Sequence, residues 1–198
     1  MKLYLKPGAC SLASHIVLEE IGAPYDTMRV DLKTKKMADG GDFFGVNPKG
    51  YVPALELQGG GVLTENVAVL GYLGDRKPEA KLAPAAGTME RYRMIEWLGF
   101  ISSEMHKSFS PFFAGWPEEA KAASKQKLEK RLDHVEKALQ GKDYLMGADF
   151  TVADAYLYTM LTWAPAAGLD VAKWPTVKAY QERVAARPAV KAAHAAEA

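Results

Sequence analysis

Glycine and alanine are distributed unevenly along this chain of 198 residues, which restricts the folds that it can adopt. Residues 1–80 hold 11 of the 17 glycines but only 7 of the 31 alanines, whereas the rest of the chain holds 24 alanines. Alanine favours helices most strongly, and glycine destabilises them. We therefore predict two domains: residues 1–80, with strands and helices, and residues 87–198, with helices alone.

Composition and charge exclude several classes of protein. The chain has 25 Lys and Arg residues against 24 Asp and Glu residues, so it lacks the basic excess that is typical of nucleic-acid binding. It contains no run of about 18 apolar residues that could cross a membrane, and Lys6 and Pro7 interrupt any signal-peptide core. Cys10 is the single cysteine, so neither an intramolecular disulfide nor a zinc site of several cysteines can form. We expect no nucleic-acid, membrane or metal partner.

The first domain has the pattern of a βαβ unit followed by a ββα unit. A short apolar run at 3–5 precedes a helical pattern at 11–21, and a second strand follows at 25–32. A crossover of this kind joins parallel strands. Residues 52–57 begin a hairpin whose turn contains three consecutive glycines, and a helix at 65–74 ends the domain.

The second domain consists of helical patterns only. The longest pattern runs from 88 to 113, and a charged amphipathic helix covers 118–139. The segment 152–168 is apolar on nearly all sides, so we expect it to be the buried central helix. Two further helices, at 176–186 and 189–196, each follow a proline.

Cys10 is the first candidate for chemistry. It follows a Pro-Gly turn and comes directly before the helical pattern at 11–21. The amide groups and the dipole at a helix N-terminus stabilise a thiolate and can lower the pKa of the thiol below neutral. The alternative is that Cys10 packs under the turn as a small apolar residue.

Two further segments could bind a peptide-like ligand. A cis peptide bond before Pro53 would turn the backbone of Val52 outward, where its N–H and C=O could pair with an extended peptide. An ordinary trans proline at a sheet edge is the alternative. Glu65 and Asn66 open the next helix, whose N-terminus can bind a carboxylate while Glu65 holds an ammonium group. Both residues also suit plain capping, and the two roles are compatible.

The long helix carries a polar stripe. Its members share one face because they are spaced 4, 3 and 4 residues apart, and they are Gly99, Ser103, His106 and Ser110. Four aromatic residues lie near the end of the stripe, which is more typical of a cleft wall than of a core seam. His106 is therefore a candidate for catalysis, with a structural or exposed histidine as the alternative. The other three histidines lack such a context.

Five segments resemble the beta class of bacterial glutathione S-transferases, and the resemblance extends from one end of the chain to the other. It implies a thioredoxin-like N-terminal domain (βαβ-ββα) followed by an all-helical C-terminal domain, which is the glutathione S-transferase-like architecture. The composition split agrees with this arrangement. The segments are residues 4–14, 47–53, 63–65, 96–111 and 149–154.

The resemblance implies glutathione as co-substrate and no metal. Cys10 corresponds to the cysteine that touches the glutathione sulfur and can form a mixed disulfide with it, and His106 is implied to lie close to that sulfur. Lys35 corresponds to a lysine near the glycyl carboxylate, and Val52 to the backbone clamp before a cis-proline. The complete set of implied glutathione-binding residues is Cys10, Lys35, Val52, Pro53, Glu65, Asn66, Ser103, Glu104 and His106.

The chain departs from the family pattern at two of the positions considered. Glu65 and Asn66 correspond to the residues that bind the γ-glutamyl end, where the family often has serine after the glutamate. Asn66 can still form hydrogen bonds there. Gly99 stands where the family often has asparagine, so it removes one polar contact or leaves room beside the cleft.

The resulting prediction is a glutathione S-transferase that conjugates the glutathione thiolate to small hydrophobic electrophiles, with Cys10 and His106 as catalytic residues. One alternative is a thiol-disulfide or peroxide reductase in which Cys10 itself reacts. Another is a non-catalytic ligand-binding protein on the same scaffold. Residues expected to line the electrophile pocket, besides His106, are Tyr51, Phe109, Phe113 and Trp163.

The resemblance also implies a cytoplasmic homodimer. In a closed pair with two-fold symmetry, each apolar surface patch is used twice. The helices expected at 65–74 and 88–113 carry more apolar residues than one core face needs. The surplus side chains that we expect at the dimer interface are Tyr72, Met89, Tyr92 and Met94.

Overall fold

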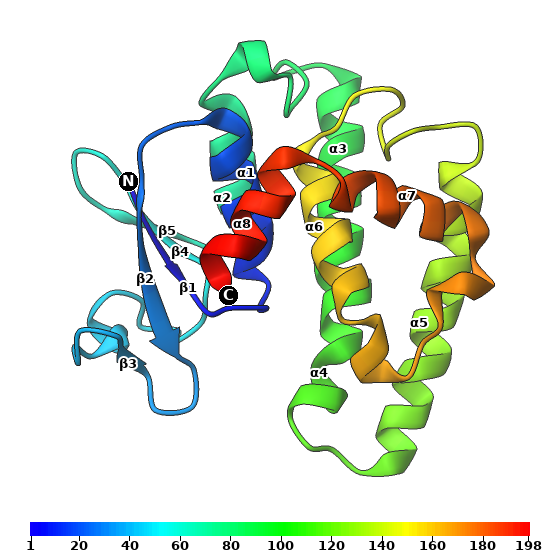
Figure 1. Ribbon diagram of the computed structural model, residues 1–198, viewed down its shortest axis with the longest axis horizontal. Helices are drawn as coiled ribbons and strands as arrows, with labels where there is room; N and C mark the ends of the chain where they lie inside the picture. Colours follow the sequence, from blue (N-terminus) through cyan, green and yellow to red (C-terminus); the bar gives the residue numbers. More distant parts are fainter. The chain divides into compact units, whose positions relative to one another are not determined.

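A computed structural model describes all residues of the chain, 1–198 (Figure 1). The chain divides into two units, which are described separately below. The first unit comprises Met1–Leu82 together with Arg187–Ala198, and the second comprises Ala83–Ala186. The expected second domain ran to residue 198, whereas the last helix of the chain groups with the first unit.

A five-stranded sheet with the order β3-β2-β1-β4-β5 forms the centre of the first unit. The strands β1 and β2 are parallel, and the other neighbouring pairs are antiparallel. The predicted order βαβ-ββα is confirmed. The strand β3 was not predicted, because a strand of two residues shows no periodicity in the sequence. The elements are β1 (Lys2–Leu5), α1 (Ser11–Ile21), β2 (Asp26–Asp31), β3 (Lys36–Met37), β4 (Ala54–Glu56), β5 (Val62–Thr64) and α2 (Asn66–Asp75).

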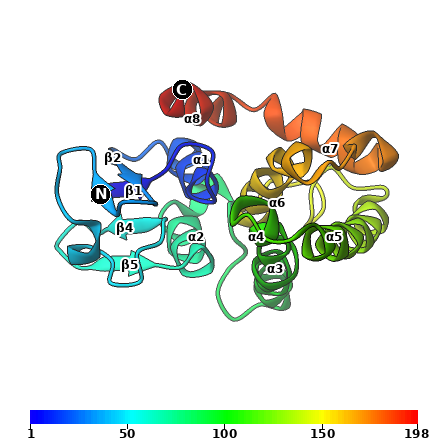
Figure 2. The ribbon, with the colours of Figure 1, turned by 90° about the horizontal axis from the view of Figure 1, so that it is seen from below.

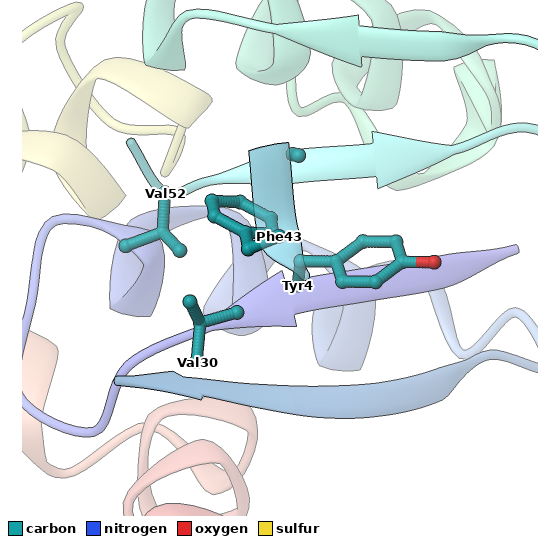
Figure 3. Packing of buried hydrophobic residues seen from close by; sticks show 5 residues of the cluster. Tyr4, Val30, Phe43 and Val52 are labelled. Atoms are coloured by element: carbon teal, nitrogen blue, oxygen red, sulfur yellow. The ribbon is translucent and has the colours of Figure 1, made fainter. Parts of the chain in front are cut away.

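Both faces of this sheet are covered. The helices α1 and α2 lie on one face, and α8 (Pro188–Glu197) packs beside α1 (Figure 2). Because strand side chains alternate, Tyr4 points to the opposite face from Leu3 and Leu5. On that face it packs in a buried cluster with Val30, Phe43, Val52 and Ala54 (Figure 3). Val52 is the predicted backbone clamp, and the cluster anchors the segment that ends at this residue.

The second unit consists of helices arranged around α6. Every residue from Val152 to Leu161 of this helix is buried, which confirms the predicted central helix. It ends at Thr162 rather than at the predicted residue 168, because Pro165 cannot continue an α-helix. The helices of this unit are α3 (Met89–Phe100), a π-helix (Ile101–His106), α4 (Lys107–Phe113), α5 (Glu118–Leu139), α6 (Val152–Thr162) and α7 (Pro175–Ala185).

The predicted long helix at 88–113 is not uniformly α-helical. The π-helix at Ile101–His106 interrupts it, and its i→i+5 hydrogen bonds place more residues in each turn. The prediction that the residues from Gly99 to Ser110 form one stripe assumed α-helical spacing throughout, and this assumption is wrong. None of the helices in the structure is both long and apolar enough to span a membrane.

The last helix is attached to the first unit by polar contacts, of which one is buried and the others are partly buried. Glu197 accepts a hydrogen bond from the backbone N–H of Gly8 at 2.9 Å, and its other oxygen lies 2.9 Å from Nδ1 of His15. Both side chains are almost completely buried. At the start of α8, Arg187 forms two hydrogen bonds, of 2.6 and 3.0 Å, with the carboxylate of Glu20. These contacts hold α8 against α1 and against the turn that precedes Cys10.

Replacing Glu197 with alanine should destabilise the protein by about 2–3 kcal/mol, because the buried His15 ring and the backbone N–H of Gly8 would both lose their acceptor. Urea unfolding at a fixed protein concentration measures this loss. Glu182→Ala is the matched control, because Glu182 is exposed and lies 3.9 Å from an equally exposed Lys178. It should change stability by less than about 0.5 kcal/mol. Equal effects of the two substitutions would contradict the structural role of Glu197.

Candidate active site

Cys10 occupies the N-cap position of α1. The turn before it is held by Ser11, whose hydroxyl accepts from the backbone N–H of Lys6 at 3.2 Å. The Cys10 thiol donates to the backbone oxygen of Val52 at 3.2 Å. The helix N-terminus favours the thiolate, whereas this hydrogen bond favours the protonated thiol. The environment of the sulfur therefore combines two opposing effects, of which the sequence indicated only the first.

The segment that leads to Val52 is held by its own side chains. The peptide bond between Val52 and Pro53 is cis, as predicted. Buried Asn47 donates from its side-chain amide to the backbone oxygen of Tyr51 at 2.7 Å, and its oxygen accepts from the N–H of Lys49 at 3.1 Å. The strand β4 begins only at Ala54, so the backbone of Val52 lies outside the sheet ladder. The sheet ladder therefore does not use the N–H and C=O of Val52, although the C=O accepts from the Cys10 thiol.

Lys35 lies beside the same segment. Its ammonium group donates to the backbone oxygen of Gly50 at 2.9 Å and lies 5.6 Å from the centre of the Tyr51 ring. An ammonium group has three donors, so Lys35 retains capacity for a carboxylate. Tyr51 is 66% exposed. This arrangement offers a cation and an aromatic surface next to the Val52 backbone.

Glu65 and Asn66 have different surroundings, although they are adjacent. The Glu65 side chain is exposed and lies 2.5 Å from the ammonium group of Lys49. Asn66 is buried, donates to the backbone oxygen of Cys10 at 2.9 Å and accepts from the Ser14 hydroxyl at 3.0 Å. We therefore expect the Asn66 side chain to position the Cys10 turn. The backbone N–H of Asn66 lies in the first turn of α2, and we expect it to face a ligand.

Two of the expected glutathione-binding residues have unusual backbone angles. Lys35 has a φ of 59° and Glu65 a φ of 70°, in a chain with only three non-glycine residues at positive φ. Such conformations cost about 1–3 kcal/mol each and cluster at ligand sites. Neither residue type signals this conformation, so sequence reasoning missed it.

The second unit contains a cluster of aromatic rings around Trp163. Its ring meets those of His106, Phe109 and Phe113 edge to face, with centroid distances of 5.1, 5.6 and 5.0 Å. Phe109 is buried, whereas Phe113 is 57% exposed. The structure thus brings together the expected pocket residues that belong to this unit. Tyr51, the other expected pocket residue, belongs to the first unit.

The three expected site residues of the π-helix have different partners. The Ser103 hydroxyl donates to the backbone oxygen of Gly99 at 2.9 Å. The Glu104 carboxylate accepts from the Arg131 guanidinium at 2.5 and 3.0 Å, and this hydrogen bonding lowers the pKa of Glu104. His106 faces α6, where its Nδ1 lies 2.7 Å from the hydroxyl of Tyr156.

Tyr156 and Gly99 add two observations to this part of the site. Sequence reasoning missed Tyr156, because a tyrosine inside an apolar helix gives no signal of a polar partner. At Gly99, an added Cβ atom would meet no atom within 4 Å. The departure from asparagine at this position therefore leaves open space beside the helix.

Comparison with known proteins identifies the family. "Glutathione S-transferase, N-terminal domain" matches residues 8–76, and "Glutathione S-transferase, C-terminal domain" matches residues 100–188. The Glutathione S-transferase GstA of Escherichia coli O157:H7 is 46% identical over 198 residues, covering 100% of this chain and 98% of that protein. The chain therefore belongs to the glutathione S-transferase family.

Comparison with solved structures identifies the class within this family. The bacterial beta-class glutathione S-transferase of Sphingomonas chungbukensis matches with a TM-score of 0.97 and 49% identity, covering 100% of this chain and 98% of that chain. A sphingomonad glutathione S-transferase complexed with glutathione matches with a TM-score of 0.96 and 48% identity, over the same shares of the two chains. The predicted resemblance to the bacterial beta class is confirmed.

Glu65→Gln should weaken glutathione binding roughly tenfold, because it removes the charge-assisted hydrogen bond that we expect between Glu65 and the ligand ammonium group while keeping the side-chain shape. Calorimetric titration with glutathione measures the change. Glu79→Gln, at another exposed glutamate of the first unit, is the control and should leave affinity unchanged. Unchanged affinity in Glu65→Gln would mean that Glu65 serves only as the partner of Lys49.

Proposed function

We propose that this enzyme conjugates the thiol of glutathione to small hydrophobic electrophiles. One observation carries the proposal: three groups of contacts, linked by short stretches of chain, involve the expected glutathione-binding residues of the first unit. Cys10 contacts Val52 and Asn66, Glu65 contacts Lys49, and Lys35 contacts the backbone just before Val52. A tripeptide with an extended backbone and charged ends needs such a combination of backbone and charged groups.

The groups of this site match the parts of glutathione. The Val52 backbone can pair with the cysteinyl residue, as a strand is added to an edge. The amides that begin α2 suit the carboxylate of the γ-glutamyl end, and Glu65 suits its ammonium group. Lys35 suits the glycyl carboxylate at the other end of the tripeptide.

The chemical step is a substitution at an electrophilic carbon. The glutathione thiol loses its proton to solvent water, the thiolate sulfur forms a bond to carbon, and the bond from that carbon to a halide or similar group breaks, so that this group leaves as an anion with the bonding electron pair. In our proposal His106 donates a hydrogen bond to the sulfur and so favours the thiolate. The rings of Phe109, Phe113 and Trp163 bind the flat apolar part of the electrophile.

The role of Cys10 separates conjugation from the reductase alternative, which the comparisons do not favour. In conjugation the nucleophile belongs to glutathione, whereas disulfide reduction through a mixed disulfide needs the sulfur of Cys10 itself. The non-catalytic alternative would bind glutathione without either activity.

Cys10→Ala should therefore retain most of the conjugating activity and lose the disulfide-reducing activity. Steady-state assays with a chloro-dinitrobenzene and with a small mixed disulfide of glutathione, run in parallel, measure both. Cys10→Ser is the control for the size of the side chain. A large and equal loss of both activities would contradict this division of roles, and glutathione binding without activity in the wild type would favour a binding protein.

We further propose a homodimer, located in the cytoplasm as the family resemblance implies. The helix α3 exposes three apolar side chains at a spacing of three residues, Met89, Tyr92 and Ile95. A stripe of this size on one helix face suits the matching stripe of a second copy. Met94, which the sequence suggested for the interface, is fully buried inside its own unit and is unavailable to a partner.

Light scattering at micromolar protein should give about twice the chain mass of 21.6 kDa. Tyr92→Glu should shift the protein toward the monomer, because it would bury a charge in an apolar contact. Gln126→Glu introduces the same charge at an exposed position of α5 and should leave the dimer intact. A monomeric wild type would contradict the proposal.

A further inference from the structure

Tyr156 is a buried polar residue that the glutathione transferase mechanism above does not use. It lies in the middle of α6 and is 1% exposed. Its hydroxyl lies 2.7 Å from Nδ1 of His106, and the two rings meet edge to face at an angle of 85°. The His106 ring also meets the Trp163 ring at 5.1 Å. The imidazole is therefore in contact with two side chains, Tyr156 in α6 and Trp163 directly after it.

The donor and acceptor roles in the hydrogen bond between Tyr156 and His106 depend on which nitrogen of the imidazole carries the proton. A phenol hydroxyl is a stronger donor than an imidazole N–H, and an imidazole nitrogen with a lone pair is a stronger acceptor than a phenol oxygen. The favoured arrangement therefore has the hydroxyl donating to Nδ1. A neutral imidazole has one N–H group, so its proton must then lie on Nε2.

We propose that Tyr156 is a positioning residue that holds His106 as the tautomer with its proton on Nε2. In this form His106 presents an N–H donor, which is the form needed to stabilise a thiolate. The other tautomer would present a lone pair at Nε2 and would repel a negatively charged sulfur. The inference rests on the proposed function, in which His106 donates a hydrogen bond to the glutathione sulfur.

Nitrogen NMR of the full-length protein tests the tautomer directly. With ¹⁵N-labelled histidine, wild-type His106 should show Nδ1 as the unprotonated nitrogen and Nε2 as the protonated one. The signals are assigned by their loss in His106→Asn. In Tyr156→Phe, which keeps the ring and removes only the hydroxyl, the nitrogen shifts of His106 should move toward those of a mixture of tautomers. The signals of the other three histidines, which should stay in place, report that the fold is intact.

Kinetics test whether Tyr156 acts through His106. Tyr156→Phe should lower kcat for a chloro-dinitrobenzene about tenfold, the effect of one hydrogen bond, with little change in KM for glutathione. In a His106→Asn background the same substitution should have no further effect. Tyr158→Phe is the matched control, because Tyr158 is a buried tyrosine two positions along the same helix. It should change neither kcat nor the His106 signals.

The outcomes separate this inference from the function on which it rests. Equal nitrogen shifts of His106 in the wild type and Tyr156→Phe would overturn the positioning role. A wild-type His106 with its proton on Nδ1 would overturn it as well, even if Tyr156→Phe did not fold. If His106→Asn conjugated as fast as the wild type, the proposed role of His106 would fail, while the NMR result would still decide what Tyr156 does.

Discussion

The turn that carries Cys10 is held by hydrogen bonds from three parts of the chain that are far apart in sequence. Asn66 at the start of α2 binds the backbone oxygen of Cys10, and the backbone oxygen of Val52 accepts from its thiol. Glu197 in α8 accepts from the backbone N–H of Gly8, within the turn. The position of the sulfur thus depends on the correct packing of α2, α8 and the segment before β4. This dependence couples the stability of the first unit to the geometry of the site.

The second unit depends on the buried helix α6 in a comparable way. Burial raises the pKa of Asp154, and four hydrogen bonds from Leu145, Thr151 and Tyr180 stabilise its carboxylate in the interior. Asp154 and Thr151 form the capping box that begins α6. The same helix carries Tyr156 and ends at Thr162, directly before Trp163, the centre of the aromatic cluster. The element that stabilises this unit therefore also places the groups that face the electrophile in our proposal.

Local patterns predicted most of the fold and a large part of the candidate site. Residue type, the spacing of apolar residues and the positions of glycine and proline were sufficient to predict the order of strands and helices in the first unit and the bounds of α5. They also led to Cys10 at a helix start and to the cis bond before Pro53. The π-helix at Ile101–His106 was not predicted, because helix periodicity does not distinguish a local change in hydrogen-bond spacing. Phe109 and Phe113 were predicted as pocket residues because they lie close together near the end of the polar stripe, whereas the contact of Trp163 with them arises from the packing of the chain directly after α6 against α4.

The sequence by itself determined the order of the helices and of most strands and their approximate positions, because caps, prolines, glycines and apolar periodicity act over a few residues. It also determined the family, because the motifs that carry the resemblance are short and local. Only the tertiary structure decided the partners of the polar side chains: Asn66 with Cys10, His15 with Glu197, and His106 with Tyr156. The two members of each pair are at least 50 residues apart in the chain. Such pairings arise from the packing of whole elements, in which a buried polar group must find whichever partner the fold brings within reach.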